Sequence, residues 1–254
     1  MTNRATRALA AICGIAGVLM LTAHFLIPAN VPPDSASLGR IALFAREHRD
    51  AILISAWLQV TGAILYVVFI LAVVQLAGAG QRFAGRIVAL AAAILVGLTL
   101  VDSAMIISVV QSAEHGHSET LRVSFDLMVG PGNDAIGRSF LIAPAILLPI
   151  GFVILQTQLL PRSYGWIAIA FGAASQSLGL FGLFSRTAFA DINPVVLALE
   201  NLWLIMVAVT LLVNRRSPDP QPVITQQPDG PTVSPDRWTS TAPSGQTAAT
   251  SRAS

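Results

Sequence analysis

Residues 85–110 read GRIVALAAAILVGLTLVDSAMIISVV, an apolar run interrupted by one carboxylate, Asp102. A run of this length can cross a bilayer as an α-helix, because about 20 apolar residues span a hydrocarbon core of about 30 Å. A carboxylate inside such a helix costs on the order of 3 kcal/mol of insertion free energy. Asp102 is therefore expected to face protein or water, and it is the first candidate functional residue of the chain.

The composition of the whole chain is that of a membrane protein. Of its 254 residues, 54% are hydrophobic and 11% are charged, whereas soluble domains usually carry about 25% charged residues. The formal net charge of +2 is too small to indicate nucleic-acid binding. The single cysteine, Cys13, excludes an intramolecular disulfide bond.

Six apolar stretches predict an all-α membrane protein built as a six-transmembrane-helix bundle. The expected spans are residues 8–27, 51–77, 85–110, 135–159, 164–184 and 194–213. Pro144 and Pro149 predict a kink in the fourth span. Asn193 followed by Pro194 suits the capped start of the sixth. Residues 1–216 are thus expected to form one transmembrane domain.

The remaining segments have a different composition. Residues 217–254 are rich in Pro, Ser, Thr and Gln and have no apolar periodicity, which predicts a disordered tail. Leu38–His48 reads as a short amphipathic helix, because Ile41, Phe44 and Ala45 fall on one face. Such a helix is expected to lie at the membrane interface.

Polar side chains in five of the spans are expected at similar depth. At 1.5 Å per residue they lie within about 5–12 Å of the helix ends opposite the chain termini. This predicts a polar cavity on that side, suited to a proton, a cation or a small polar ligand. The candidate residues are Asp102, Glu200, Gln59, Gln176 and His24. The alternative is that these groups hydrogen-bond the helices together, with the acids protonated or paired with Arg138 or Arg186.

A second group of polar residues follows the third span. Glu114, His115, His117 and Glu119 are residue types that bind Zn²⁺ or Cu²⁺. Their spacing matches no familiar metal-ligand pattern, so a solvated loop that responds to pH through its two histidines is the stronger interpretation. No metal and no cofactor are therefore expected.

Small residues form a stripe along one face of the fifth span, which predicts a tight helix–helix seam because such residues let backbones approach. The partner is either another helix of the chain or a second copy, so a homo-oligomer is one of the two expectations. The stripe consists of Gly165, Ala168, Gly172, Ser175, Gly179 and Gly182.

Three stretches resemble uncharacterised six-helix integral membrane proteins of bacteria, of an actinobacterial type. They are FAREHRDAILISAWLQVTGAILYVVFILAVVQL (residues 44–76), VDSAMI (101–106) and PRSYGWIAIAFGAASQSLG (161–179). The resemblance covers residues 7–216 and implies a six-helix bundle in the bacterial plasma membrane, with no known activity. The density of arginine in the short flanks on the side of the chain ends predicts cytoplasmic N- and C-termini.

Two classes of function remain open at this stage. The chain lacks the serine, paired-acid, HExxH, haem and phosphate-loop patterns of membrane and soluble enzymes, so a non-enzymatic structural or regulatory membrane protein is the first expectation. The alternative is a small transporter, or an ion- or proton-coupled ligand binder, that uses Asp102 and Glu200.

Overall fold

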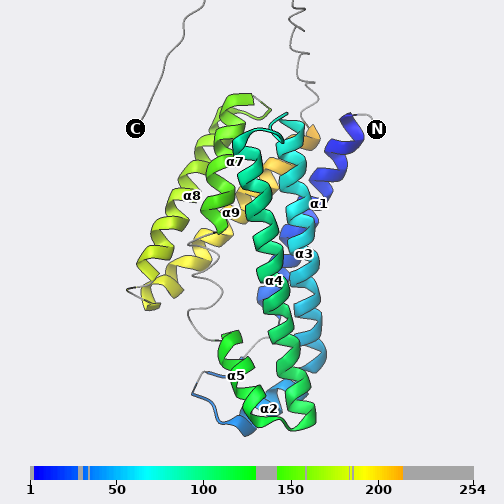
Figure 1. The fold of residues 1–254 in the computed structure, drawn as a ribbon, viewed down its shortest axis with the longest axis vertical. Coiled ribbons are helices and arrows are strands. Elements are labelled where there is room, and N and C mark those ends of the chain that lie inside the picture. Colours follow the sequence, from blue (N-terminus) through cyan, green and yellow to red (C-terminus); the bar gives the residue numbers. More distant parts are fainter. Residues whose placement is uncertain are drawn as a thin grey trace, which may run out of the picture. The chain divides into compact units, whose positions relative to one another are not determined.

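The computed structural model describes residues 3–27, 31–33, 35–129, 142–157, 159–182, 184 and 186–213 (Figure 1). Its helices are α1 (Asn3–Leu26), α2 (Leu38–Glu47), α3 (Arg49–Leu76), α4 (Phe83–His115), α5 (Ser118–Val129), α7 (Ala143–Thr157), α8 (Arg162–Gly182) and α9 (Arg186–Val213). The described ranges contain no β-strand. The expected tail, residues 217–254, and the start of the expected fourth span, residues 135–141, lie outside them.

Five helices are long and apolar enough to cross a membrane, namely α1, α3, α4, α8 and α9. The helix α7 is apolar but shorter. The prediction of an all-α, multi-pass membrane protein is confirmed. Because α7 follows residues outside the description, the full length of the fourth span stays a prediction.

Successive spanning helices run in alternating directions (Figure 1). The start of α1, the turn between α3 and α4, the turn between α7 and α8, and the end of α9 lie at one end of the bundle, here called the terminal side. The helices α2 and α5 lie at the opposite end, here called the cap side. This arrangement agrees with an even number of membrane crossings.

Two helix boundaries differ from the predicted spans. The third span was expected to end at Val110, but α4 continues to His115 and ends at Gly116, which adopts a left-handed conformation (φ 75°). The sixth span was expected to begin at Pro194, but α9 begins at Arg186 and contains Pro194. The capped start at Asn193 is therefore wrong. One proline inside a spanning helix is tolerated because neighbouring groups can satisfy the carbonyl that it frees.

The helices α1 and α3 are in backbone contact at two glycines. A Cβ atom on Gly17 would lie 2.7 Å from the backbone nitrogen of Tyr66, and one on Gly62 would lie 3.0 Å from that of Leu21. No side chain larger than hydrogen fits at either position without moving a helix. This seam was not predicted, since the two glycines belong to different spans.

The stripe of small residues on α8 is buried along its length. Its partner includes α7 of the same chain: a Cβ atom on Gly165 would lie 2.9 Å from the carbonyl oxygen of Gly151, and one on Gly172 would lie 2.8 Å from Leu148 Cγ. The predicted tight seam is confirmed, and the chain supplies its partner. A second copy would have to displace α7 to reach these glycines, so a homo-oligomer through the stripe stays a prediction.

The cap side has a hydrophobic core of its own. Ile41 and Phe44 of α2 pack with Ile52 of α3, Val109 of α4 and Phe125 of α5. The predicted apolar face of α2 is thus confirmed, but it packs against other helices of the chain. The cap thereby anchors the end of α4 next to the candidate polar residues.

Candidate functional site

One face of α3 carries most of the polar contacts inside the bundle. Ser55, Gln59, Gly62 and Tyr66 recur at helical spacing and share this face. Gln59 is 0% exposed and Ser55 is 2% exposed. Because buried polar groups are stable only when they are hydrogen-bonded, their partners identify which other helices contribute to the site.

Gln59 joins α3 to α4 through both atoms of its amide. Its Nε2 donates a hydrogen bond to Asp102 Oδ2, and its Oε1 accepts one from Ser103 Oγ at 3.1 Å. The amide can therefore rotate only if both contacts break. The structure brings Gln59 and Asp102 together, as the comparison of depths predicted.

His24 lies one turn nearer the cap side, against Ser55. Its Nδ1 is 2.8 Å from Ser55 Oγ, and Ser55 Oγ donates in turn to the backbone carbonyl of His24 at 3.3 Å. His24 Nδ1 also lies 3.2 Å from the backbone carbonyl oxygen of Ser55. We call His24, Ser55, Gln59, Asp102 and Ser103 the cap-side cluster.

Glu200 belongs to a second cluster. Ser175 Oγ of α8 donates a hydrogen bond to Glu200 Oε1 of α9. We call Ser175 and Glu200 the mid-bundle cluster. The sequence placed Ser175 in the packing stripe of α8 and gave no sign that it bonds an acid.

The two acids lie at similar distances from the cap-side ends of their helices. Asp102 lies about 20 Å from the end of α4, and Glu200 lies about 21 Å from the start of α9. Because α9 begins earlier than expected, Glu200 is not a first-turn residue. The single polar layer stays a prediction. One turn after Gln59, α3 carries Gly62, which packs against Leu21 and Gly17 of α1.

Gln176 is separated from both clusters. It is exposed on α8 beside buried Ser175, and within the described part of the chain its side chain makes no hydrogen bond. The depth of Gln176 was compatible with the predicted cavity, but adjacent residues of a helix point in directions about 100° apart. Depth alone could not distinguish the inner face from the outer one.

Trp203 adds a buried donor one turn from Glu200. Its side chain is 1% exposed, and its indole Nε1–H has no hydrogen-bond partner among the described residues. A buried donor without a partner typically costs 1–3 kcal/mol. This residue had not been singled out from the sequence.

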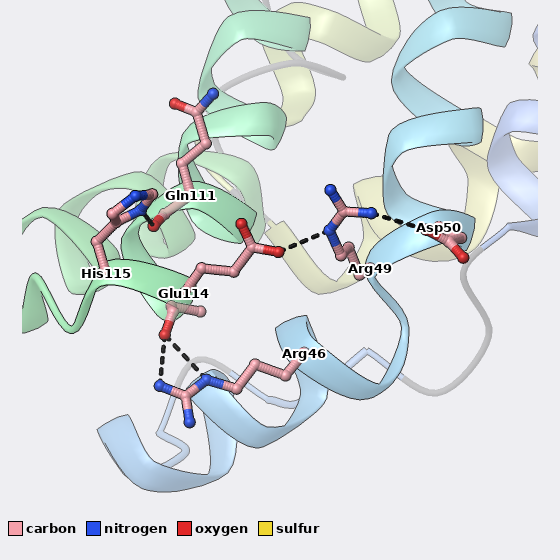
Figure 2. Close-up of polar contacts among 7 residues, drawn as sticks. Arg46, Arg49, Asp50, Gln111, Glu114 and His115 are labelled. Atoms are coloured by element: carbon pink, nitrogen blue, oxygen red, sulfur yellow. Dashed lines mark hydrogen bonds and ion pairs between the residues drawn. The ribbon is translucent and has the colours of Figure 1, made fainter.

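Glu114 and His115 lie at the cap, where they make structural contacts (Figure 2). Arg49 Nε lies 2.6 Å from Glu114 Oε1, and Arg46 donates two hydrogen bonds to the backbone carbonyl of Ala113. His115 Nδ1 is 2.8 Å from the carbonyl oxygen of Gln111. These contacts tie α2 and α3 to the end of α4.

The candidate metal ligands are not gathered at one point. The rings of His115 and His117 stack with centroids 6.2 Å apart. Across the described residues, no three histidine, cysteine or acidic side chains are arranged to hold a metal ion. Glu119 is exposed in the first turn of α5.

Comparison of the chain with models of protein families, with curated proteins and with solved structures gave no match.

Proposed function

We propose that this multi-pass membrane protein binds and releases protons at Asp102 and Glu200 inside its helical bundle, as a small proton-coupled binder or transporter. The observation that carries the proposal is the hydrogen bonding of the two carboxylates. Asp102 accepts from the amide of Gln59, and Glu200 accepts from the hydroxyl of Ser175. Both donors are neutral, so neither contact requires a permanent charge on the acid.

The amide of Gln59 is compatible with both protonation states of Asp102. Nε2 donates to Asp102 Oδ2 while Oε1 accepts from Ser103 Oγ, and a carboxyl oxygen accepts from an amide whether the group is ionised or protonated. The hydroxyl of Ser175 can rotate, so that it donates to an ionised Glu200 and accepts from a protonated one.

A purely structural role does not require a carboxylate at these positions. Amide and hydroxyl groups hold spanning helices together without a titratable group. A carboxylate in the same place costs on the order of 3 kcal/mol of insertion free energy. Two carboxylates inside spanning helices are thus better explained by proton binding than by helix association.

The experiment replaces each acid by its amide. Asp102→Asn and Glu200→Gln keep size and hydrogen bonding but cannot ionise. We expect the thermal unfolding midpoint of the wild type in neutral detergent to vary with pH, and each substitution to remove part of that variation. Asp126→Asn is the matched control, because Asp126 pairs with Arg122 on exposed α5. If both amide variants follow the wild-type pH curve, the proposal fails.

A structural or regulatory protein is the competing proposal. It is supported by the bridge that Gln59 makes between Asp102 and Ser103 across α3 and α4. It predicts an unfolding midpoint that does not change with pH over the range in which the exposed charged residues of the cap keep their charge. A non-enzymatic role, membership of the bacterial group named above, and a plasma-membrane location with cytoplasmic termini stay proposals in either case.

A further inference from the structure

The terminal side of the bundle is positively charged and, within the described residues, has no carboxylate. The arginines of this side lie in α1, at the start of α4 and at the start of α8. They are Arg4, Arg7, Arg82, Arg86 and Arg162. The cap side carries both signs, as the pairs Arg49–Glu114 and Arg122–Asp126 show.

Four of these arginines have no counter-charge among the described residues. Arg4, Arg82, Arg86 and Arg162 are exposed, and their side chains make no ion pair or hydrogen bond with the described part of the chain. We call these four residues the terminal arginine patch. The guanidinium groups of the cap differ, because Arg46, Arg49 and Arg122 are bound to carbonyl or carboxylate oxygens of the protein.

The arginines of the patch occupy electrostatically unfavourable positions within the fold itself. The N-terminus of a helix carries a partial positive charge, so a cation there is repelled. Arg4, Arg86 and Arg162 lie in the first turns of α1, α4 and α8, which contain no acidic residue. The helices α3, α7 and α9 end on this side, and their last turns contain no basic residue. Internal helix dipoles therefore do not explain where the arginines are.

We infer that the terminal arginine patch binds the phosphate groups of anionic phospholipid headgroups. Guanidinium groups bind phosphate oxygens through paired N–H donors. Exposed aromatic residues accompany the patch: Phe83 follows Arg82 and is 80% exposed, and Trp166 lies one turn after Arg162 and is 63% exposed. Aromatic side chains of spanning helices gather at the membrane–water interface, which places these arginines at headgroup level.

The expected preference for anionic lipid follows from the number of arginines in the patch. Each arginine near an anionic membrane surface strengthens binding about fivefold. Four arginines would together favour an anionic lipid over a zwitterionic one by roughly several hundred-fold at low salt. This inference does not rest on the proposed function, because it involves neither Asp102 nor Glu200.

The experiment compares full-length protein in nanodiscs of phosphatidylcholine and of an equal mixture with phosphatidylglycerol. In the wild type we expect phosphatidylglycerol to raise the unfolding midpoint by several degrees, and high salt to reduce the rise. We expect the fourfold variant Arg4→Gln, Arg82→Gln, Arg86→Gln, Arg162→Gln to lose most of it. Arg40→Gln is the control, since Arg40 is exposed on α2 at the cap side.

A second measurement does not depend on stability. Brominated phosphatidylglycerol should quench the fluorescence of Trp166, isolated as the difference between wild type and Trp166→Phe, more strongly than brominated phosphatidylcholine. The fourfold variant should remove that preference. Equal quenching by the two lipids in the wild type, or an unchanged preference in the fourfold variant, overturns the inference. So does an equal rise in midpoint with inorganic phosphate in phosphatidylcholine alone, which would identify free phosphate as the ligand.

Discussion

Asp102 and Glu200 are both acids inside apolar helices, but their surroundings differ. Asp102 contacts an amide whose orientation is held by Ser103, whereas Glu200 contacts a hydroxyl that can rotate. Asp102 lies in α4, and Glu200 lies near the middle of α9. Under the proposed function, the held amide orients Asp102, and the rotating hydroxyl lets Glu200 change its protonation state without a rearrangement of helices.

Gly62, at the contact between α3 and α1, should be the position most sensitive to substitution. Gly62→Val places two methyl groups against the backbone of α1, where an added Cβ atom already lies 3.0 Å from Leu21 N. We expect a loss of at least about 3 kcal/mol in the free energy of unfolding, because backbone cannot yield as side chains do. Chemical denaturation in detergent measures it.

The control for this prediction is Gly97→Val in α4. A Cβ atom on Gly97 would meet nothing within 4 Å, so only the small effect of a β-branched residue is expected there. Equal losses at Gly62 and Gly97 would show that the α1–α3 seam is not a tight contact.

The next largest effect should come from the amide that orients Asp102. Gln59→Leu removes both hydrogen bonds and leaves the half-buried Asp102 carboxylate and the buried Ser103 hydroxyl without this partner, which should cost about 2–3 kcal/mol of unfolding free energy. Gln176→Leu is the matched substitution at the exposed position of α8 and should change stability little. A similar cost at the two positions would contradict the assignment of Gln59 to the inner face and Gln176 to the outer one.

The smallest effect is expected at the mid-bundle cluster. Ser175→Ala should lower the free energy of unfolding by about 1 kcal/mol, because a single hydrogen bond is lost. It should also alter the pH at which Glu200 titrates. Ser177→Ala is the control, since Ser177 is exposed and bonds to the carbonyl of Ala173 in its own helix. An effect on titration from Ser177→Ala, with none from Ser175→Ala, would remove Ser175 from the site.

The apolar runs predicted the spanning helices well, because the cost of an unsatisfied backbone in lipid leaves few alternatives to a helix. They did not predict where α4 ends or where α9 begins. Beyond Val110, polar residues continue the helix because α2 and α5 pack around it. Pro194, which is a start signal in soluble helices, lies inside α9.

Contacts between helices were harder to predict than the helices themselves. The comparison of depths correctly brought Gln59 and Asp102 together. The partner of Gly62 on α1, and the bond from Ser175 to Glu200, depend on how separate spans are aligned. That alignment is set by close packing over many residues, and no single stretch of sequence contains it.

The most direct test of proton binding is infrared spectroscopy of the purified protein as pH is varied. A protonated carboxyl group has a carbonyl band distinct from that of a carboxylate, and asparagine and glutamine lack it. We predict that the wild type shows pH-dependent carboxyl bands, of which Asp102→Asn removes one and Glu200→Gln another, while Asp126→Asn leaves both. Identical pH-dependent carboxyl bands in the wild type and in the double variant Asp102→Asn, Glu200→Gln would contradict proton binding at these residues.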